Sequence, residues 1–251
     1  SVDGHRAEPR SEHSKARLTG PHPLRGYPTY VSGASQGVPR GEASPLGDAD
    51  WTGTRGMSSP TKEQIRRALA KRRRQIVADP RLRRAAVLMP VYEDGDGLQV
   101  LFTKRSEELP HHKGQIAFPG GTQQPEDQNP HATALRESEE EVGLRPGDVE
   151  VLGELDDTVT ATSNFVVTPF VGFIPYPYSF RVNPAEIVEL IPIPLSLLCD
   201  PSRFREELWD RDGGKTPVYY YTVGSHVIWG LTARILKQFL EAVFPASKAT
   251  P

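Results

Sequence analysis

The sequence predicts one domain of mixed-sheet α/β or α+β class. Strand-like runs lie both before and after the helical runs, without the regular alternation of strand and helix that builds a parallel sheet. No internal repeat is evident. The 251 residues are 37% hydrophobic and 25% charged, a composition that provides a core and excludes disorder over the whole chain.

Residues 1–56 are set apart by their composition. They contain nine glycines and six prolines, but only six residues of the set Leu, Ile, Val, Met and Phe. Such a segment cannot bury enough apolar surface to offset the entropy lost on ordering. We therefore expect a disordered N-terminal extension over residues 1–56 and one domain over residues 57–251. Met57 stands just before the first helix signal, so a natural start there is a hypothesis that N-terminal mass analysis of the native protein would test.

The first expected helix is strongly basic. Ser59 provides a cap, Pro60 suits the first helical position, and the helix is expected to run to about Val77. Residues 62–84 contain ten basic and two acidic side chains. One interpretation is an anion-binding surface for nucleic acid or phosphates. The favoured interpretation is a solvated helix, because no aromatic residues are interleaved for base stacking. Its inward-facing residues would be Ile65, Leu69 and Ile76.

The remaining elements follow from alternation, turn residues and helical periodicity. The run AAVLMPVY from Ala85, the turn EDGDG and the run LQVLFTK predict a β-hairpin. Further strands are expected at residues 149–155, 165–174, 218–223 and 226–229, and helices at about residues 130–142 and 231–244. Residues 175–184 are expected to form an exposed loop. For the apolar stripe of the last helix, core packing is favoured over a homodimer face.

Charge and cysteine content narrow the class of protein. The net charge is −2, from 30 basic and 32 acidic residues, so no global field indicates a polyanionic partner. Cys199 is the single cysteine, which excludes an intrachain disulfide framework and is typical of a reducing compartment. The most apolar segments are broken by prolines or Glu189 and fall short of the ~20 residues that cross a bilayer. We expect a soluble, cytoplasmic protein without a membrane partner.

The stretch from Phe118 to Leu144 carries the chemistry. Asn129 and Gly143 suit the two ends of its helix. Glu137, Glu140 and Glu141 follow at i, i+3 and i+4, so their carboxylates rise from one side and repel each other. A bound cation or Arg136 would compensate this repulsion.

Oxygen-only ligands select a hard divalent cation, Mg²⁺ or Mn²⁺, and such an ion suits the hydrolysis of a diphosphate. The alternative is an acidic solvent face. The turn Phe118-Pro119-Gly120-Gly121 favours a site, because its two glycines let backbone approach a ligand.

The motif GG…RESEEEVGL resembles the signature of the Nudix hydrolases, which cleave nucleoside diphosphates linked to another moiety. The resemblance implies metal binding by Glu137, Glu140 and Glu141, an orienting role for Arg136, and Gly121 as the loop glycine. Two positions depart from the pattern. The spacing from the glycine to the arginine is one residue longer, with Asp127 in the acidic place, and Ser138 stands where an apolar residue is usual. The Ser138 hydroxyl is expected to bond back to the helix backbone.

The segment LFTKRSEELPHHKGQIAFPGG, residues 101–121, is similar to the extra motif of the coenzyme A pyrophosphatase branch of that family. The likeness extends over about residues 85–244. It implies an α/β/α sandwich around a mixed sheet, and hydrolysis of coenzyme A or its thioesters. The products would be adenosine 3′,5′-bisphosphate and 4′-phosphopantetheine or its acylated form. Residues 57–251 are accordingly expected to form a Nudix hydrolase domain with a small-molecule substrate.

Several side chains near the motif are candidates to bind the anionic substrate. These are Lys104, Arg105, Lys113, Gln115, Gly120 and Gly121. For Lys104 and Lys113 the alternative is strand-end solubility, and for Gln115 it is closure of the loop. The residues expected to take part in catalysis are Glu140, Glu141, Arg136 and Glu189. The identity of the general base stays open among Glu140, Glu141, Glu186 and Glu189.

Two other functions remain open from the sequence. A different Nudix substrate, such as ADP-ribose or a dinucleoside polyphosphate, would use the same acidic helix. A non-catalytic module would bind nucleic acid through the basic surface of residues 62–84, with steep salt dependence. Hydrolysis of a panel of diphosphates with Mg²⁺ or Mn²⁺ separates these possibilities.

Overall fold

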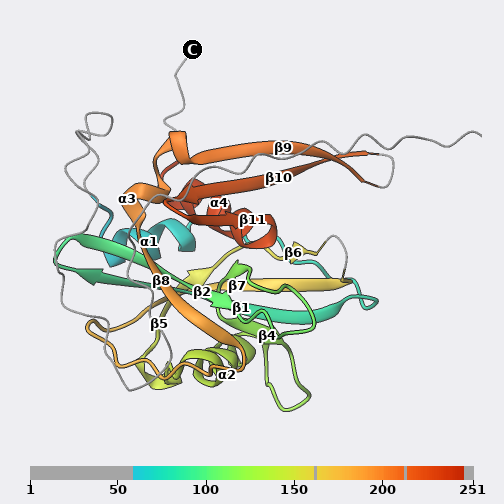
Figure 1. Ribbon diagram of the computed structural model, residues 1–251, viewed down its shortest axis with the longest axis horizontal. Helices are drawn as coiled ribbons and strands as arrows, with labels where there is room; N and C mark the ends of the chain where they lie inside the picture. Colours follow the sequence, from blue (N-terminus) through green and yellow to red (C-terminus); the bar gives the residue numbers. More distant parts are fainter. Residues whose placement is uncertain (1–58, 161–162, 212–213, 246–251) are drawn as a thin grey trace, which may run out of the picture.

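The computed structural model describes residues 59–160, 163–211 and 214–245. The expected N-terminal extension and Met57 lie outside these residues. In the described part no helix is long and apolar enough to cross a membrane. The elements form a large mixed sheet, a smaller antiparallel sheet and the helices that cover them (Figure 1).

The large sheet is mixed because one of its pairings is parallel. Strands β1 (Arg83–Asp94) and β7 (Phe165–Phe173) run parallel, with Arg83 opposite Phe165. The described residues give the central order β3-β2-β1-β7-β5, and β4 pairs with β1, β6 with β7 and β8 with β2. The other strands are β2 (Gly97–Arg105), β3 (Ile116–Ala117), β4 (Gly120–Thr122), β5 (Glu150–Glu154), β6 (Thr158–Val159) and β8 (Ile187–Pro194). The expected β1–β2 hairpin is confirmed, with Asp94 opposite Gly97.

The helices cover both faces of the large sheet. α2 (Pro130–Val142) packs on one face, where Ala134 and Val142 meet Leu88 and Leu101. α1 (Lys62–Ala70) and α4 (Gly230–Val243) lie on the opposite face (Figure 1). The α/β/α arrangement expected from the resemblance is therefore confirmed. Three short helical turns complete the chain: η1 (Pro146–Asp148), α3 (Leu195–Leu198) and η2 (Pro201–Arg203).

The second sheet is antiparallel, in the order β11-β10-β9, and lies on the α4 side. Its strands are β9 (Phe204–Arg211), β10 (Gly214–Val223) and β11 (His226–Trp229). The favoured core role of the α4 stripe is confirmed, because Ile235, Leu236 and Phe239 are buried among residues of both sheets.

The prediction for the first helix is wrong at both ends. Thr61, not Ser59, caps it, because its side chain accepts from Gln64 N while the Gln64 side chain accepts from Thr61 N. The helix ends at Ala70 instead of Val77. Beyond it the chain bonds to the segment after β5, where Asp157 N donates to Gln75 O. Tertiary hydrogen bonds thus replace helical ones, and Ile76 is 65% exposed instead of buried.

Half of the ten basic residues in residues 62–84 form ion pairs with described acidic residues. Ion pairs join Lys62 and Arg66 to Glu150, Arg72 to Asp156, and Arg74 to Glu154 and Asp157. The side chain of Asp157 is completely buried and also accepts from Thr168 Oγ1 and Val77 N. Part of the basic surface is therefore neutralised within the fold.

Five strands and one loop differ from the sequence predictions. The strands β3, β4 and β6 were not expected, since each is too short for an alternation signal. Among the described strands β8 pairs only with β2, and its two prolines suit an edge position. The strand β9 is a charged edge strand of the second sheet. Residues 175–184 contain no helix or strand, but Tyr178 and Phe180 are 8% and 5% exposed and pack under α2, so the prediction of an exposed loop is wrong for these two residues.

Candidate active site

The acidic helix α2 begins and ends where the sequence predicts. The Asn129 side chain accepts from Ala132 N at 2.9 Å, and Pro130 occupies the first turn. Gly143 ends the helix in the left-handed conformation at φ 69°, with its N–H donating to Glu139 O. Ser138 is fully buried, and its Oγ donates to Ala134 O at 2.7 Å, so the expected return to the backbone is confirmed.

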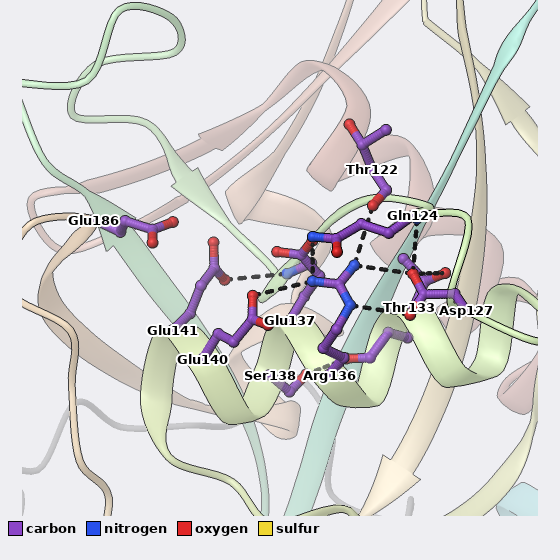
Figure 2. A network of polar contacts seen from close by, with 12 residues as sticks. Thr122, Gln124, Asp127, Thr133, Arg136, Glu137, Ser138, Glu140, Glu141 and Glu186 are labelled. Atoms are coloured by element: carbon purple, nitrogen blue, oxygen red, sulfur yellow. Dashed lines mark hydrogen bonds and ion pairs between the residues drawn. The ribbon is translucent and has the colours of Figure 1, made fainter.

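Arg136 ties the helix to the loop before it (Figure 2). Its Nε and Nη2 donate to the two oxygens of Asp127 at 3.0 and 2.9 Å, and Nη2 also donates to Thr122 O at 3.2 Å. These hydrogen bonds lower the pKa of Asp127 to about 2. The longer spacing in the motif therefore still delivers an acidic partner to the arginine.

The same guanidinium compensates the carboxylates of the helix. Nη1 lies 2.9 Å from Glu137 Oε1 and 3.0 Å from Glu140 Oε2. Of the two compensations expected from the sequence, a cation or Arg136, the structure shows the arginine. Because a bidentate pair with Asp127 holds the guanidinium, its position is set from outside the glutamate cluster.

Glu141 is the most buried carboxylate of the helix, at 2% exposure. One oxygen accepts from Gly120 N at 3.1 Å and the other lies 3.4 Å from Arg105 Nη1. Burial raises the pKa of Glu141 to about 7, and the nearby charges of Glu137 and Glu186 act in the same direction. This environment disfavours the carboxylate unless positive charge is close to it.

Gly120 and Gly121 allow the turn to approach both sheet and helix. A Cβ at Gly120, where φ is 154°, would lie 2.4 Å from Ala86 O. A Cβ at Gly121 would lie 2.5 Å from Glu137 Cδ. The predicted need for little bulk in this turn therefore has two separate causes, a backbone contact at the first glycine and a carboxylate at the second.

The three glutamates do not form one cluster in the described side-chain positions, and their role as metal ligands stays a prediction. Arg136 Nη1 lies between Glu137 and Glu140, and the Glu140 side chain is 52% exposed. Within residues 59–160, 163–211 and 214–245, no three His, Cys, Asp or Glu side chains are arranged to hold a metal ion. The donor set still fits a hard cation, because the crowded carboxylates offer oxygen ligands. Burial also raises the pKa of Glu137, and a bound cation would favour the ionised form of this side chain.

Among the expected substrate-binding residues, Arg105 lies at the site. It contacts Glu141, and its Nε is buried without a hydrogen-bond partner in the described residues. The Gln115 side chain lies 3.0 Å from His112 Nδ1, while Gln115 O accepts from Arg105 N. This geometry favours closure of the loop as the role of Gln115. Lys113 is exposed on that loop.

Lys104 and Glu189 are separated from the helix carboxylates by the sheet. They are opposite each other in the β2–β8 ladder, and both influence the pKa of His226 on β11. Phe102 and Ile191, two residues away on the same strands and therefore on the same face of the sheet, belong to the core on the α4 side. The register thus puts Glu189 and Lys104 on the face away from Glu141, while a catalytic role for Glu189 and a substrate-binding role for Lys104 stay predictions.

Glu186 faces the acidic helix instead (Figure 2). Its charge raises the pKa of both Glu137 and Glu141. Asn183, which the sequence reasoning missed, positions it: Nδ2 donates to Glu186 Oε1 at 3.0 Å, and the Asn183 N–H donates to Glu141 O at 2.8 Å. The sequence signal that could have indicated this role is an asparagine directly before Pro-Ala-Glu. The Asn183 side chain accepts from Ala185 N and so forms an Asx turn.

The fold and site define a class of enzyme, a hydrolase with a glycine turn, an anchoring arginine and an acidic helix beside a mixed sheet. The NUDIX domain family model matches residues 82–194. A Nudix hydrolase named NudL from Photorhabdus laumondii, described as uncharacterized, is 41% identical over 161 residues, covering 64% of this chain and 85% of that protein. NudL of Yersinia pestis strain Pestoides F is 40% identical, covering 64% and 80%.

The chain belongs to the Nudix hydrolase family and is a pyrophosphohydrolase of phosphorus-containing anhydrides. Enzymes of this family act on nucleoside diphosphate derivatives and generally use divalent metal ions. Among solved structures, the MutT/nudix family protein from Enterococcus faecalis is 14% identical, covers 74% of this chain and 76% of that chain, and has a TM-score of 0.47.

Proposed function

We propose that this enzyme hydrolyses the diphosphate bond of coenzyme A or its thioesters. The products would be adenosine 3′,5′-bisphosphate and 4′-phosphopantetheine or its acylated form. The observation that carries the proposal is the position of Arg105. This residue belongs to the segment of residues 101–121 that resembles the coenzyme A branch, and its guanidinium lies against Glu141.

Arg105 has a donor left for the substrate. Its Nη1 faces Glu141, while its buried Nε has no hydrogen-bond partner in the described residues. A buried donor without a partner is costly, so an anionic oxygen of a bound diphosphate would stabilise it. The same guanidinium would then contact both the acidic helix and the substrate. Lys113 and Gln115, on the loop between β2 and β3, would border the substrate, and Gly120 and Gly121 would bring backbone close to it.

We assign the metal ligands to Glu137, Glu140 and Glu141, with Mg²⁺ or Mn²⁺ as the ion. When bound, the ion would neutralise charge on the diphosphate and lower the pKa of the attacking water. Arg136 would have to release Glu137 and Glu140 in part, and its pair with Asp127 keeps it in place while these two side chains turn. Arg136 is a positioning residue in this scheme.

Glu186 replaces Glu189 as the proposed general base. Its carboxylate faces the helix glutamates, and Asn183 fixes it at 3.0 Å. It would accept the proton of the attacking water while one phosphate leaves with the bond electrons. Correct placement of such a base contributes ~10²–10⁴-fold to the rate.

The non-catalytic nucleic-acid module loses support, because Lys62, Arg66, Arg72 and Arg74 are paired with acidic residues. We propose a single domain over residues 57–251, supported by the packing of Ile65 and Phe239 in one cluster with strand residues. The single cysteine, Cys199, is consistent with a cytoplasmic location. Burial raises the pKa of its thiol to about 11, so the thiol is unreactive.

Product analysis tests the function directly. Incubation of the full chain with coenzyme A and Mg²⁺ or Mn²⁺ should release adenosine 3′,5′-bisphosphate, and ADP-ribose and diadenosine tetraphosphate should react more slowly. Glu141→Gln should reduce turnover sharply while the circular dichroism spectrum stays unchanged. Faster hydrolysis of ADP-ribose would replace coenzyme A as the substrate, and near-normal activity of Glu141→Gln would remove that residue from the site.

A further inference from the structure

A groove lies between α1 and α4. Both helices are on the face of the sheet opposite to α2 (Figure 1). Its volume is about 680 Å³, within the range of about 300–1,000 Å³ that is typical of small-molecule sites. The helix carboxylates and Arg105 do not line it. The groove is therefore separate from the candidate active site.

One wall of the groove is cationic. Arg67 and Lys71 are exposed, lie one turn apart on α1, and form no ion pair or side-chain hydrogen bond with any described residue. Like charges at this spacing repel each other. Arg72 also lines the groove, and its Nη1 is buried and has no hydrogen-bond partner in the described part of the chain. These three side chains offer donors that the fold does not use.

The acidic residues of the groove do not supply the missing partners. Asp156 already accepts from Arg72 Nη2 at 2.8 Å and from Gln75 N at 3.0 Å. Glu241 is paired with Lys237 on its own helix. The groove therefore keeps an excess of positive charge from Arg67 and Lys71.

The rest of the wall is apolar apart from the side chains of Gln64 and Gln238. Ala68 faces the groove from α1, and Ala242, Val243 and Pro245 face it from the end of α4. A ligand that fits both parts needs an anionic group and a compact apolar or planar group. The neighbouring cations Lys62, Arg66 and Arg74 are paired with acidic residues, so among the basic residues 62–74 only Arg67, Lys71 and the exposed Arg73 form no ion pair with a described residue.

We propose that the α1–α4 groove binds a small organic phosphate. Its phosphate would contact Arg67, Lys71 and Arg72, and its organic part would lie against the apolar wall. This second site does not depend on the identity of the hydrolysed substrate.

The test is isothermal titration of the full chain carrying Glu141→Gln, in EDTA, with adenosine 3′,5′-bisphosphate as the probe. The double substitution Arg67→Gln and Lys71→Gln should weaken binding about tenfold or more, since charge-assisted hydrogen bonds are lost. Arg73→Gln is the matched control, because Arg73 is exposed nearby but does not line the groove, and it should change affinity by less than about twofold. Thermal melting should show that both proteins are folded.

Four results would overturn the proposal. They are no binding of the probe to the starting protein, equal affinity in the double variant, equal affinity for inorganic diphosphate, and tighter binding of single-stranded RNA that Arg73→Gln weakens as much as the double variant. The third result, equal affinity for inorganic diphosphate, would show that the groove does not recognise the organic part of the ligand. The fourth would indicate a diffuse nucleic-acid surface.

Discussion

The contact between Gly121 and Glu137 allows the metal site to be tested without direct loss of a carboxylate. A Cβ at Gly121 would lie 2.5 Å from Glu137 Cδ and 2.6 Å from both carboxylate oxygens. Ordinary van der Waals contact begins near 3.4 Å, so Gly121→Ala must displace the carboxylate by about 0.9 Å, taking 3.4 minus 2.5. Gly121 does not adopt a positive φ, and the atoms in the way are the end of a flexible side chain.

We expect Gly121→Ala to separate activity from stability. A displacement of about 1 Å in a positioning or ligand group costs about 10²-fold in rate. The free energy of unfolding should change by less than about 1 kcal/mol, because the backbone conformation suits alanine and the side chain can move. The assay is kcat/KM for a diphosphate substrate at saturating Mg²⁺, beside urea unfolding of the same protein.

The controls are alanine substitutions at two other glycines, and Gly121→Ala made in a Glu137→Gln variant. Gly95→Ala should change neither quantity, because no atom lies within 4 Å of the position that its methyl group would take and its φ is not positive. Gly120→Ala should lower the free energy of unfolding by about 2–4 kcal/mol, since the methyl would meet Ala86 O at a φ of 154°. In a Glu137→Gln background, Gly121→Ala should have little further effect on rate. Normal activity of Gly121→Ala alone would refute the assignment of Glu137 to the site.

Three further predictions follow from single contacts. Glu186→Gln should lower kcat by ~10²-fold or more while Glu189→Gln stays near the starting value; the reverse result in steady-state assays would restore Glu189 as the base. The pKa of Asp157 is below its ordinary value of 3.8, because hydrogen bonds from Arg74 and its neighbours outweigh burial, so its contribution to stability is complete above pH 3.8 and is lost as the pH falls through the lowered value. Asp157→Asn should therefore cost about 3 kcal/mol in urea unfolding near pH 7 and flatten the loss of stability below pH 4, and an unchanged acid profile would contradict this. Gly143→Ala should destabilise by about 1–3 kcal/mol, because φ is 69° and the methyl would lie 2.7 Å from Arg181 Cβ, and an unchanged melting temperature would count against that packing.

The sequence by itself determined the elements whose signals are local. The limits of α2 follow from Asn129, Pro130 and Gly143, each of which acts within one turn of the helix. The β1–β2 hairpin follows from alternation around a glycine-rich turn. The class of chemistry also follows from local spacing, because i, i+3 and i+4 glutamates must share a side of any helix they form.

Tertiary structure decided where distant segments meet. Residues after Ala70 leave the helix because Gln75, Arg72 and Arg74 find partners after β5, and no local rule foresees those partners. The tertiary structure also decided how the guanidinium of Arg136 divides its N–H donors between the loop before α2 and the two glutamates Glu137 and Glu140.

The choice between Glu186 and Glu189 depends on strand register. In the β2–β8 ladder Lys104 is opposite Glu189, but Arg105 is opposite Ile187, so β8 contains one extra residue at this point. Such a bulge reverses which side chains face each side of the sheet beyond it. Register is set by pairing across the whole sheet, which is why spacing along the chain could name both glutamates but could not place either one.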